Sequence, residues 1–240
     1  MGHGDPKITE AQNRVLQVFA REASRFALAG GTALERYYLH HRFSWDLDFF
    51  SPVYDLAEIN RLTAAFKKQV DPRLKLEAQL MAGGQAKVRF YSMPVRGASR
   101  PLKIDFVEDV LIKTPDIQTI RGVRVYGTPS IYLQKVAAIA GIRPAMDAVG
   151  RVVQEGRNEP RDAFDLYMLS KKVSPLHLVL AKVDSHYQKG MIHWYRTFSR
   201  HDLKLGLLDI EIYDPGFDAR EMIGHLENEI RLFAKDIIDL

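Results

Sequence analysis

The sequence predicts an α+β fold, in which a mixed sheet flanked by helices is followed by an all-helical C-terminal lobe. Two observations support this class. Short apolar runs with strand character, separated by glycine-rich breaks, fall between residues 26 and 107. From Thr128-Pro129, a favourable helix start, the remaining residues show helical periodicity with few strand signals. We therefore expect a boundary near Gly127, with lobes at residues 1–127 and 128–240.

The N-terminal lobe is expected to alternate helices and strands. Helices are predicted over residues 9–24, 32–40 and 56–69. Strands are predicted over residues 26–29, 43–50, 74–81, 85–95 and 102–107. Residues 9–24 carry apolar side chains at helical spacing after a Thr9–Gln12 capping box. The last three extended runs are separated by short polar or glycine-containing breaks, so we expect antiparallel hairpins that continue one sheet.

Composition limits the chemistry that the chain can perform. The sequence has no cysteine, which excludes disulfides, cysteine-ligated zinc and thiolate nucleophiles. Its apolar stretches fall short of the roughly 20 residues that cross a bilayer, and Met1–Lys7 lacks a signal-peptide apolar region, so a cytoplasmic protein without a membrane partner is expected. A net charge of +4 is compatible with a polyanionic partner but does not require one.

Gly30 and Gly31 interrupt the first predicted strand just before a helix. Two glycines allow backbone amides to approach a ligand closely, and the helix that follows directs its partly positive N-terminus to the same place. The pair therefore predicts a site for a phosphate-sized anion. The alternative is a tight strand-to-helix turn without a ligand.

Three aspartates are candidates for a metal site. Asp46 and Asp48 lie on a predicted strand, where the two-residue period places both carboxylates on one face and their repulsion calls for a cation. Asp105 stands alone within a later apolar strand. Three carboxylates can hold two Mg²⁺ (or Mn²⁺) ions, which orient the triphosphate of an NTP and activate a hydroxyl for in-line displacement at the α-phosphorus. The alternatives are a solvated strand face for the pair and a turn-capping role for Asp105.

The segments Gly30–Leu34 and His41–Phe50 resemble the signature of the AbiEii/AbiGii-like nucleotidyltransferases, toxins of abortive-infection, type IV toxin–antitoxin systems. The resemblance implies a polymerase-β-like nucleotidyltransferase fold, with Gly30, Gly31, Asp46 and Asp48 at the nucleotide and metal positions and Asp105 as the third carboxylate. It also implies an antitoxin partner. Around the glycines, we expect Thr32, Arg42 and Ser44 to contact the nucleotide, although Ser44 could equally be a strand-edge hydroxyl.

Two further motifs of that family match the helical lobe. Lys135 lies in Tyr-Leu-Gln-Lys, and Asp162 and Asp165 lie in Arg-Asp-Ala-Phe-Asp-Leu-Tyr. The resemblance implies that Lys135 neutralises triphosphate charge and that Asp162 polarises the acceptor hydroxyl or positions Lys135. The residues alone allow other interpretations: Asp162 complementing the helix dipole, Asp165 pairing with Arg161, and a solvated Lys135.

We therefore expect a metal-dependent enzyme that transfers a nucleoside monophosphate from an NTP to an acceptor, with RNA, such as a tRNA end, as the expected acceptor. A basic set near the predicted sheet favours RNA: Lys67, Lys68, Arg73 and Lys75. The alternatives are a nucleotidyltransferase that modifies a small molecule and a non-catalytic nucleotide-binding or protein-interaction module.

Overall fold

The structure is a computed structural model that describes residues 4–81, 86–141, 144–146, 152–154 and 156–238. The chain divides into two compact units, Met1–Ile131 and Tyr132–Leu240. Helix α4 (Thr128–Ala140) contains the division between them. Within the described residues, no helix has both the length and the apolar character that crossing a bilayer requires.

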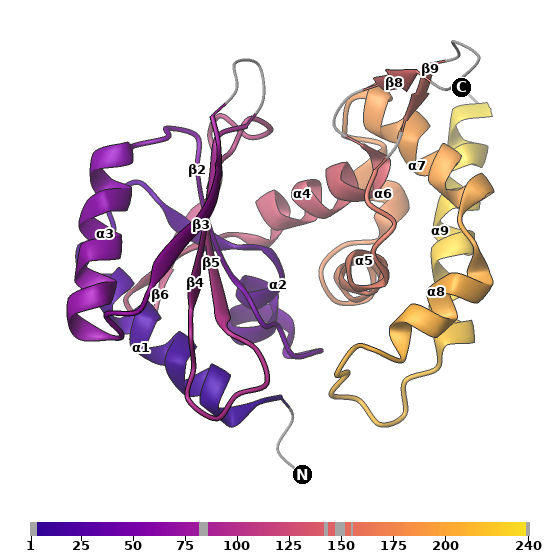
Figure 1. The fold of residues 1–240 in the computed structure, drawn as a ribbon. Helices are drawn as coiled ribbons and strands as arrows, with labels where there is room; N and C mark the ends of the chain where they lie inside the picture. Colours follow the sequence, from indigo (N-terminus) through magenta and orange to yellow (C-terminus); the bar gives the residue numbers. More distant parts are fainter. Residues whose placement is uncertain (1–3, 82–85, 142–143, 147–151, 155, 239–240) are drawn as a thin grey trace. The chain divides into compact units, whose positions relative to one another are not determined.

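The first unit is built on a seven-stranded sheet in the order β3-β4-β5-β2-β1-β7-β6 (Figure 1). The strands are β1 (Ala27–Ala29), β2 (Leu47–Ser51), β3 (Lys75–Leu80), β4 (Val88–Met93), β5 (Leu102–Glu108), β6 (Ile117–Ile120) and β7 (Val123–Tyr126). The pairs β2–β5 and β1–β7 are parallel and the other neighbours are antiparallel. This mixed sheet with flanking helices confirms the fold class that the sequence predicts.

One face of the sheet is covered by α1 (Pro6–Glu22) and α3 (Leu56–Gln69), which pack against each other (Figure 1). Phe19 of α1 stacks on Phe49 of β2 with 4.0 Å between ring centroids, so the alternate residues Leu47 and Phe49 form the core. Because strand residues alternate between faces, Asp48 points to the other side of the sheet. The predicted start of α1 at Thr9 is wrong, since the Asp5 side chain caps the helix by accepting from the Lys7 amide and Pro6 occupies the first turn.

Two strand predictions differ from the structure. The predicted strand over residues 43–50 begins only at Leu47. The carbonyls of Ser44 and Trp45 accept hydrogen bonds from the Gln12 side chain, which replaces part of a strand ladder. The hairpin β6–β7 was not predicted; Arg121 and Gly122 turn it with φ angles of 51° and 82°, the left-handed geometry of tight two-residue hairpins.

The helix after β1 begins at Gly30 rather than Thr32, as α2 (Gly30–Ala33), and continues as the π-helix η1 (Leu34–Leu39). The second unit contains the remainder of α4 and five further helices: α5 (Pro160–Lys172), α6 (Leu176–Leu180), α7 (Ser185–Thr197), α8 (Arg200–Leu207) and α9 (Ala219–Ile238). Helix α9 packs against the other four. The lobe expected to be all-helical also has two three-residue strands, β8 (Pro144–Met146) and β9 (Val152–Gln154).

Candidate active site

Gly30 brings the turn after β1 directly against a carboxylate of β2. Strand register pairs Ala29 with Asp48, so the next residue along the chain begins α2 beside that side chain. Gly30 has a φ of 67°, and a Cβ atom there would lie 2.8 Å from Oδ2 of Asp48. Glycine therefore serves both the left-handed backbone and the close approach to the carboxylate.

Gly31 lies against two of the side chains that the sequence assigned to nucleotide contact. A Cβ atom at Gly31 would be 2.5 Å from Nη2 of Arg42 and 2.9 Å from Oγ of Ser44. Both side chains belong to buried residues, with 5% and 8% exposure. The structure thus places a guanidinium charge behind the glycine turn, where it can stabilise an anion held by the turn. Direct contact of Arg42 and Ser44 with a nucleotide stays a prediction.

The loop that carries Asp46 is fixed by hydrogen bonds from two elements, α2 and α1. The Thr32 hydroxyl donates to the main-chain carbonyl of Asp46. Nε2 of Gln12, from α1, donates to the carbonyls of Ser44 at 2.9 Å and Trp45 at 3.2 Å. Nη1 of Arg36 in turn donates to Oε1 of Gln12 at 3.0 Å. These bonds give Thr32, predicted as a nucleotide contact, a role in positioning Asp46.

Gln12 is a positioning residue that the sequence analysis missed. Its side chain is fully buried among the apolar residues of α1, including Val15 and Phe19. A polar amide on the apolar face of an amphipathic helix needs hydrogen-bond partners. That pattern was the signal that could have identified Gln12 from the sequence.

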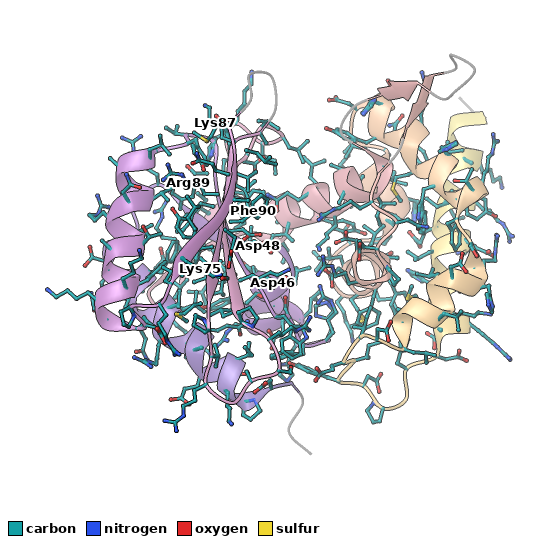
Figure 2. All side chains as sticks on the ribbon, in the orientation of Figure 1. Asp46, Asp48, Lys75, Lys87, Arg89 and Phe90 are labelled. Carbon is teal, nitrogen blue, oxygen red and sulfur yellow. The ribbon has the colours of Figure 1, made fainter. Side chains whose placement is uncertain are left out.

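The three aspartates gather on the face of the sheet opposite to α1 and α3. Asp48 and Asp105 are partners in the parallel pair β2–β5, and Asp46 immediately precedes β2. Figure 2 shows Asp46 and Asp48 on the same side of the sheet. Burial, together with the charges of Asp48 and Asp46, raises the pKa of Asp105 to about 7, against the opposing effect of Lys103. Negative charge is therefore concentrated at this point of the face.

The chemistry of this face fits a divalent cation. All three side chains offer carboxylate oxygens, the ligands that Mg²⁺ and Mn²⁺ prefer, and a cation would offset their mutual repulsion. Within the described part of the chain, no three His, Asp or Glu side chains already form a metal-binding group. A metal ion held by Asp46, Asp48 and Asp105 stays a prediction.

Lys135, Asp162 and Asp165 form a second cluster, within the helical unit. Nζ of Lys135 in α4 lies 2.6 Å from Oδ1 of Asp162 and 2.7 Å from Oδ2 of Asp165, both in α5. All three residues are buried. Burial acts to raise the pKa of Asp162, but Lys135 and Arg157 outweigh it and hold that pKa below its ordinary value. A solvated Lys135, one of the alternatives left open by the sequence, is excluded.

Solved structures with a similar fold come from Helicobacter pylori. One is a protein with a provisional assignment as a nucleotidyltransferase; it has a TM-score of 0.59 and 18% identity, over 100% of this chain and 98% of that one. Another is JHP933, with a TM-score of 0.58 and 18% identity, over 99% of this chain and 96% of that one. Comparison with the curated proteins gave no match.

The fold of this chain is the one that these solved structures share. Residues 14–239 match the model of the family described as nucleotidyl transferase AbiEii toxin, type IV toxin–antitoxin system. The chain belongs to this family, which confirms the resemblance seen in the sequence.

Proposed function

We propose that the protein transfers a nucleoside monophosphate from an NTP to a hydroxyl group of RNA, with Mg²⁺ or Mn²⁺ at Asp46, Asp48 and Asp105. The observation that carries this proposal is the register of β1, β2 and β5, which sets Gly30, Asp48 and Asp105 side by side. A glycine turn next to carboxylates suits phosphoryl transfer, because catalysis of phosphoryl transfer consists mainly of positioning the reactants and compensating their charge.

The transfer conserves atoms and charge in one displacement. The acceptor hydroxyl oxygen forms a bond to the α-phosphorus of the NTP, and the bond from that phosphorus to the β-phosphate oxygen breaks, so that pyrophosphate leaves. The hydroxyl proton passes to the carboxylate of Asp105 and from there to solvent. The bound cation would supply positive charge that offsets the triphosphate.

The residues around the glycines hold the reactants in place. The backbone of Gly30 and Gly31 cradles the triphosphate, and the Arg42 guanidinium behind Gly31 adds positive charge. Thr32 and Gln12 keep the Asp46 loop in position through its main-chain carbonyls. The resemblance implies roles at the triphosphate for Lys135 and at the acceptor hydroxyl for Asp162; within the second unit, their ion pair fixes each relative to the other.

RNA as the acceptor is supported by the distribution of charge. The first unit contains 19 Lys and Arg against 14 Asp and Glu, whereas the second contains 15 against 16. The entire positive surplus of the chain therefore lies in the unit that carries the three aspartates. A polyanion is attracted to such a surface, and a small neutral acceptor gains nothing from it. In a type IV system, an antitoxin would oppose this activity.

Incubation with each α-labelled NTP, Mg²⁺ and total RNA tests the proposal. We expect label in RNA with one or more NTPs, and none after EDTA treatment or with Asp46→Ala, whose folding is checked by circular dichroism. Label found on a small molecule or on protein, with RNA inert, would show that the acceptor class is wrong. A folded wild-type chain that binds NTP and labels nothing would favour the non-catalytic module.

A further inference from the structure

An open hollow of about 600 Å³ lies at one end of the β3–β4–β5 part of the sheet. Its walls are Arg73, Lys75 of β3, Ser92 of β4 and the turn over residues 94–101 that joins β4 to β5, including Arg100. All of these residues belong to the first unit. We call this hollow the β-turn groove.

The β-turn groove begins next to the three aspartates, on the same face of the sheet. Residues directly opposite each other on neighbouring strands share a face. Register pairs Lys75 with Ser92 in one row, and Phe90 with Asp105 in the next. Ser92 and Phe90 are two residues apart along β4, a separation of roughly 7 Å. A linear polymer that occupies the groove can therefore reach Asp105 with its next repeating group.

A second contact joins the β-turn groove to the carboxylates. The Arg100 guanidinium lies over the ring of Trp45, with 3.4 Å from its central carbon to the ring centroid. Trp45 immediately precedes Asp46 and is held through its carbonyl by Gln12. The wall of the groove and the loop of Asp46 are therefore packed together, independently of the sheet register.

The charged side chains of the β-turn groove suit phosphate. Arg73, Lys75 and Arg100 line it, against the single carboxylate of Glu77. Arg73 pairs with Asp71 at 2.7 Å and Lys75 with Glu77 at 2.9 Å, but the two cationic side chains are 60% and 66% exposed. An exposed lysine pair such as Lys75–Glu77 contributes only about 0–1 kcal/mol, so a phosphate oxygen can replace the Glu77 carboxylate at small cost. Arg73 holds Asp71 through two hydrogen bonds, at 3.0 Å and 2.7 Å, but its guanidinium has five N–H donors and can bind phosphate while that pair stays formed.

Phe90 offers an aromatic surface between the β-turn groove and the aspartates. The residue is half-buried, and strand register sets it directly opposite Asp105. Asp105 in turn pairs with Asp48, so Phe90 lies two strands from Asp48, in the same row and on the same face. Stacking on such a ring accepts any base, because every base has an aromatic face.

We infer that the β-turn groove binds the sugar-phosphate backbone of the acceptor RNA strand, with the terminal base stacked on Phe90 and the terminal hydroxyl at Asp105. The inference rests on the proposed transfer to RNA and adds the path by which the strand enters. A small-molecule acceptor would end at Asp105 and would not use the groove.

A pair of charge-matched variants tests the groove. Arg73→Ala/Lys75→Ala removes two cations from it. The structure divides the basic set that the sequence grouped together, because Lys67 and Lys68 are exposed in the last turn of α3, the helix on the opposite face of the sheet. Lys67→Ala/Lys68→Ala therefore removes the same charge away from the groove. Binding of a fluorescein-labelled single-stranded oligoribonucleotide is followed by anisotropy without NTP or metal. We expect the groove variant to bind on the order of tenfold more weakly, and the α3 variant to change by about twofold or less.

Phe90→Ala gives an independent test, in which we expect roughly tenfold weaker RNA binding.

NTP binding, measured by thermal shift, should stay unchanged in the groove variant. Equal losses in the two charge-matched variants would overturn the assignment of the groove. If the wild type labels RNA and the groove variant keeps the same KM for RNA, the assignment of the groove to RNA is wrong and the proposed function stands. If the wild type binds NTP but neither binds nor labels RNA, the RNA acceptor is wrong and the groove assignment falls with it.

Discussion

Gly30 and Gly31 are neighbours that are required for different reasons. Gly30 has a backbone conformation with φ of 67° that side chains rarely tolerate, and it also faces Asp48. Gly31 has no left-handed backbone angle, and its constraint is the space taken by Arg42 and Ser44. The sequence suggested both glycines as a phosphate cradle, but their separate constraints depend on contacts with β2 and its preceding loop that sequence spacing does not reveal.

Gly31→Val should block nucleotide binding, and it should lower the free energy of unfolding by about 1–3 kcal/mol, because the added methyl groups displace Arg42 and Ser44. Gly224→Ala is the matched control: it lies in α9 with nothing within 4 Å of an added Cβ, so helix propensity should stabilise the protein by about 0.5–1 kcal/mol. Urea unfolding and NTP titration measure both effects. Wild-type nucleotide affinity in Gly31→Val would remove the turn from the site.

Asp105 should make the metal-free protein less stable as pH rises. Its folded pKa is raised from 3.8 to about 7 by burial and by the charges of Asp48 and Asp46. The unfolded state loses this proton above about pH 4, whereas the folded state keeps it until about pH 7, so the free energy of unfolding falls across that range. The cost is at most about 4 kcal/mol. Asp105→Asn removes this charge, so its stability relative to wild type, from urea unfolding in EDTA, should grow over that pH range.

A cation provides the control for the Asp105 prediction. Above pH 7, added Mg²⁺ should stabilise the wild type more than Asp105→Asn, because the metal favours the charged carboxylates. A constant stability difference between the two proteins from pH 4 to pH 8 in EDTA would show that Asp105 experiences no such repulsion.

Among the elements, those with strong local patterns were predicted best. Helix α3 follows the predicted residues 56–69, and Asp55 caps it through the amides of Ala57 and Glu58. Elements fixed by distant contacts were missed. Strand β2 starts later than predicted because the Gln12 side chain donates hydrogen bonds to the main-chain carbonyls that precede it. Strand β7 lies inside the sheet because it pairs with β1. Local periodicity contains no information about either partner.

The helices α4 and α5 should depend on the ion pairs that join them. Lys135→Met leaves Asp162 and Asp165 buried without that cation, so it should lower the free energy of unfolding by about 3–5 kcal/mol. The triple variant Lys135→Met/Asp162→Asn/Asp165→Asn removes the uncompensated charges and should recover part of that loss. Urea unfolding compares the two. A Lys135→Met protein as stable as wild type would show that the cluster has no role in joining the helices.

At the scale of the whole molecule, the charges are divided unequally between the units, with the surplus in residues 1–131. RNA binding should therefore weaken as salt rises. Each neutralised phosphate of a single strand contributes about −0.7 to the slope of log affinity against log salt concentration, so a few contacts give a readily measured slope. Fluorescence anisotropy at several KCl concentrations and constant Mg²⁺ measures it. A slope near zero would argue against a polynucleotide acceptor.

The position of β1 also affects when the toxin becomes active during synthesis. β1 lies between β2 and β7, and its parallel pairing joins Leu28 to Val125, far along the chain. Such distant pairing forms late in folding, and a nascent chain emerges from its N-terminus. A ribosome-bound chain that stops before β7 already contains Gly30, Gly31 and the three aspartates, but it lacks the strand that completes the sheet beside them. Toxicity should therefore begin only after the β6–β7 hairpin has left the ribosome.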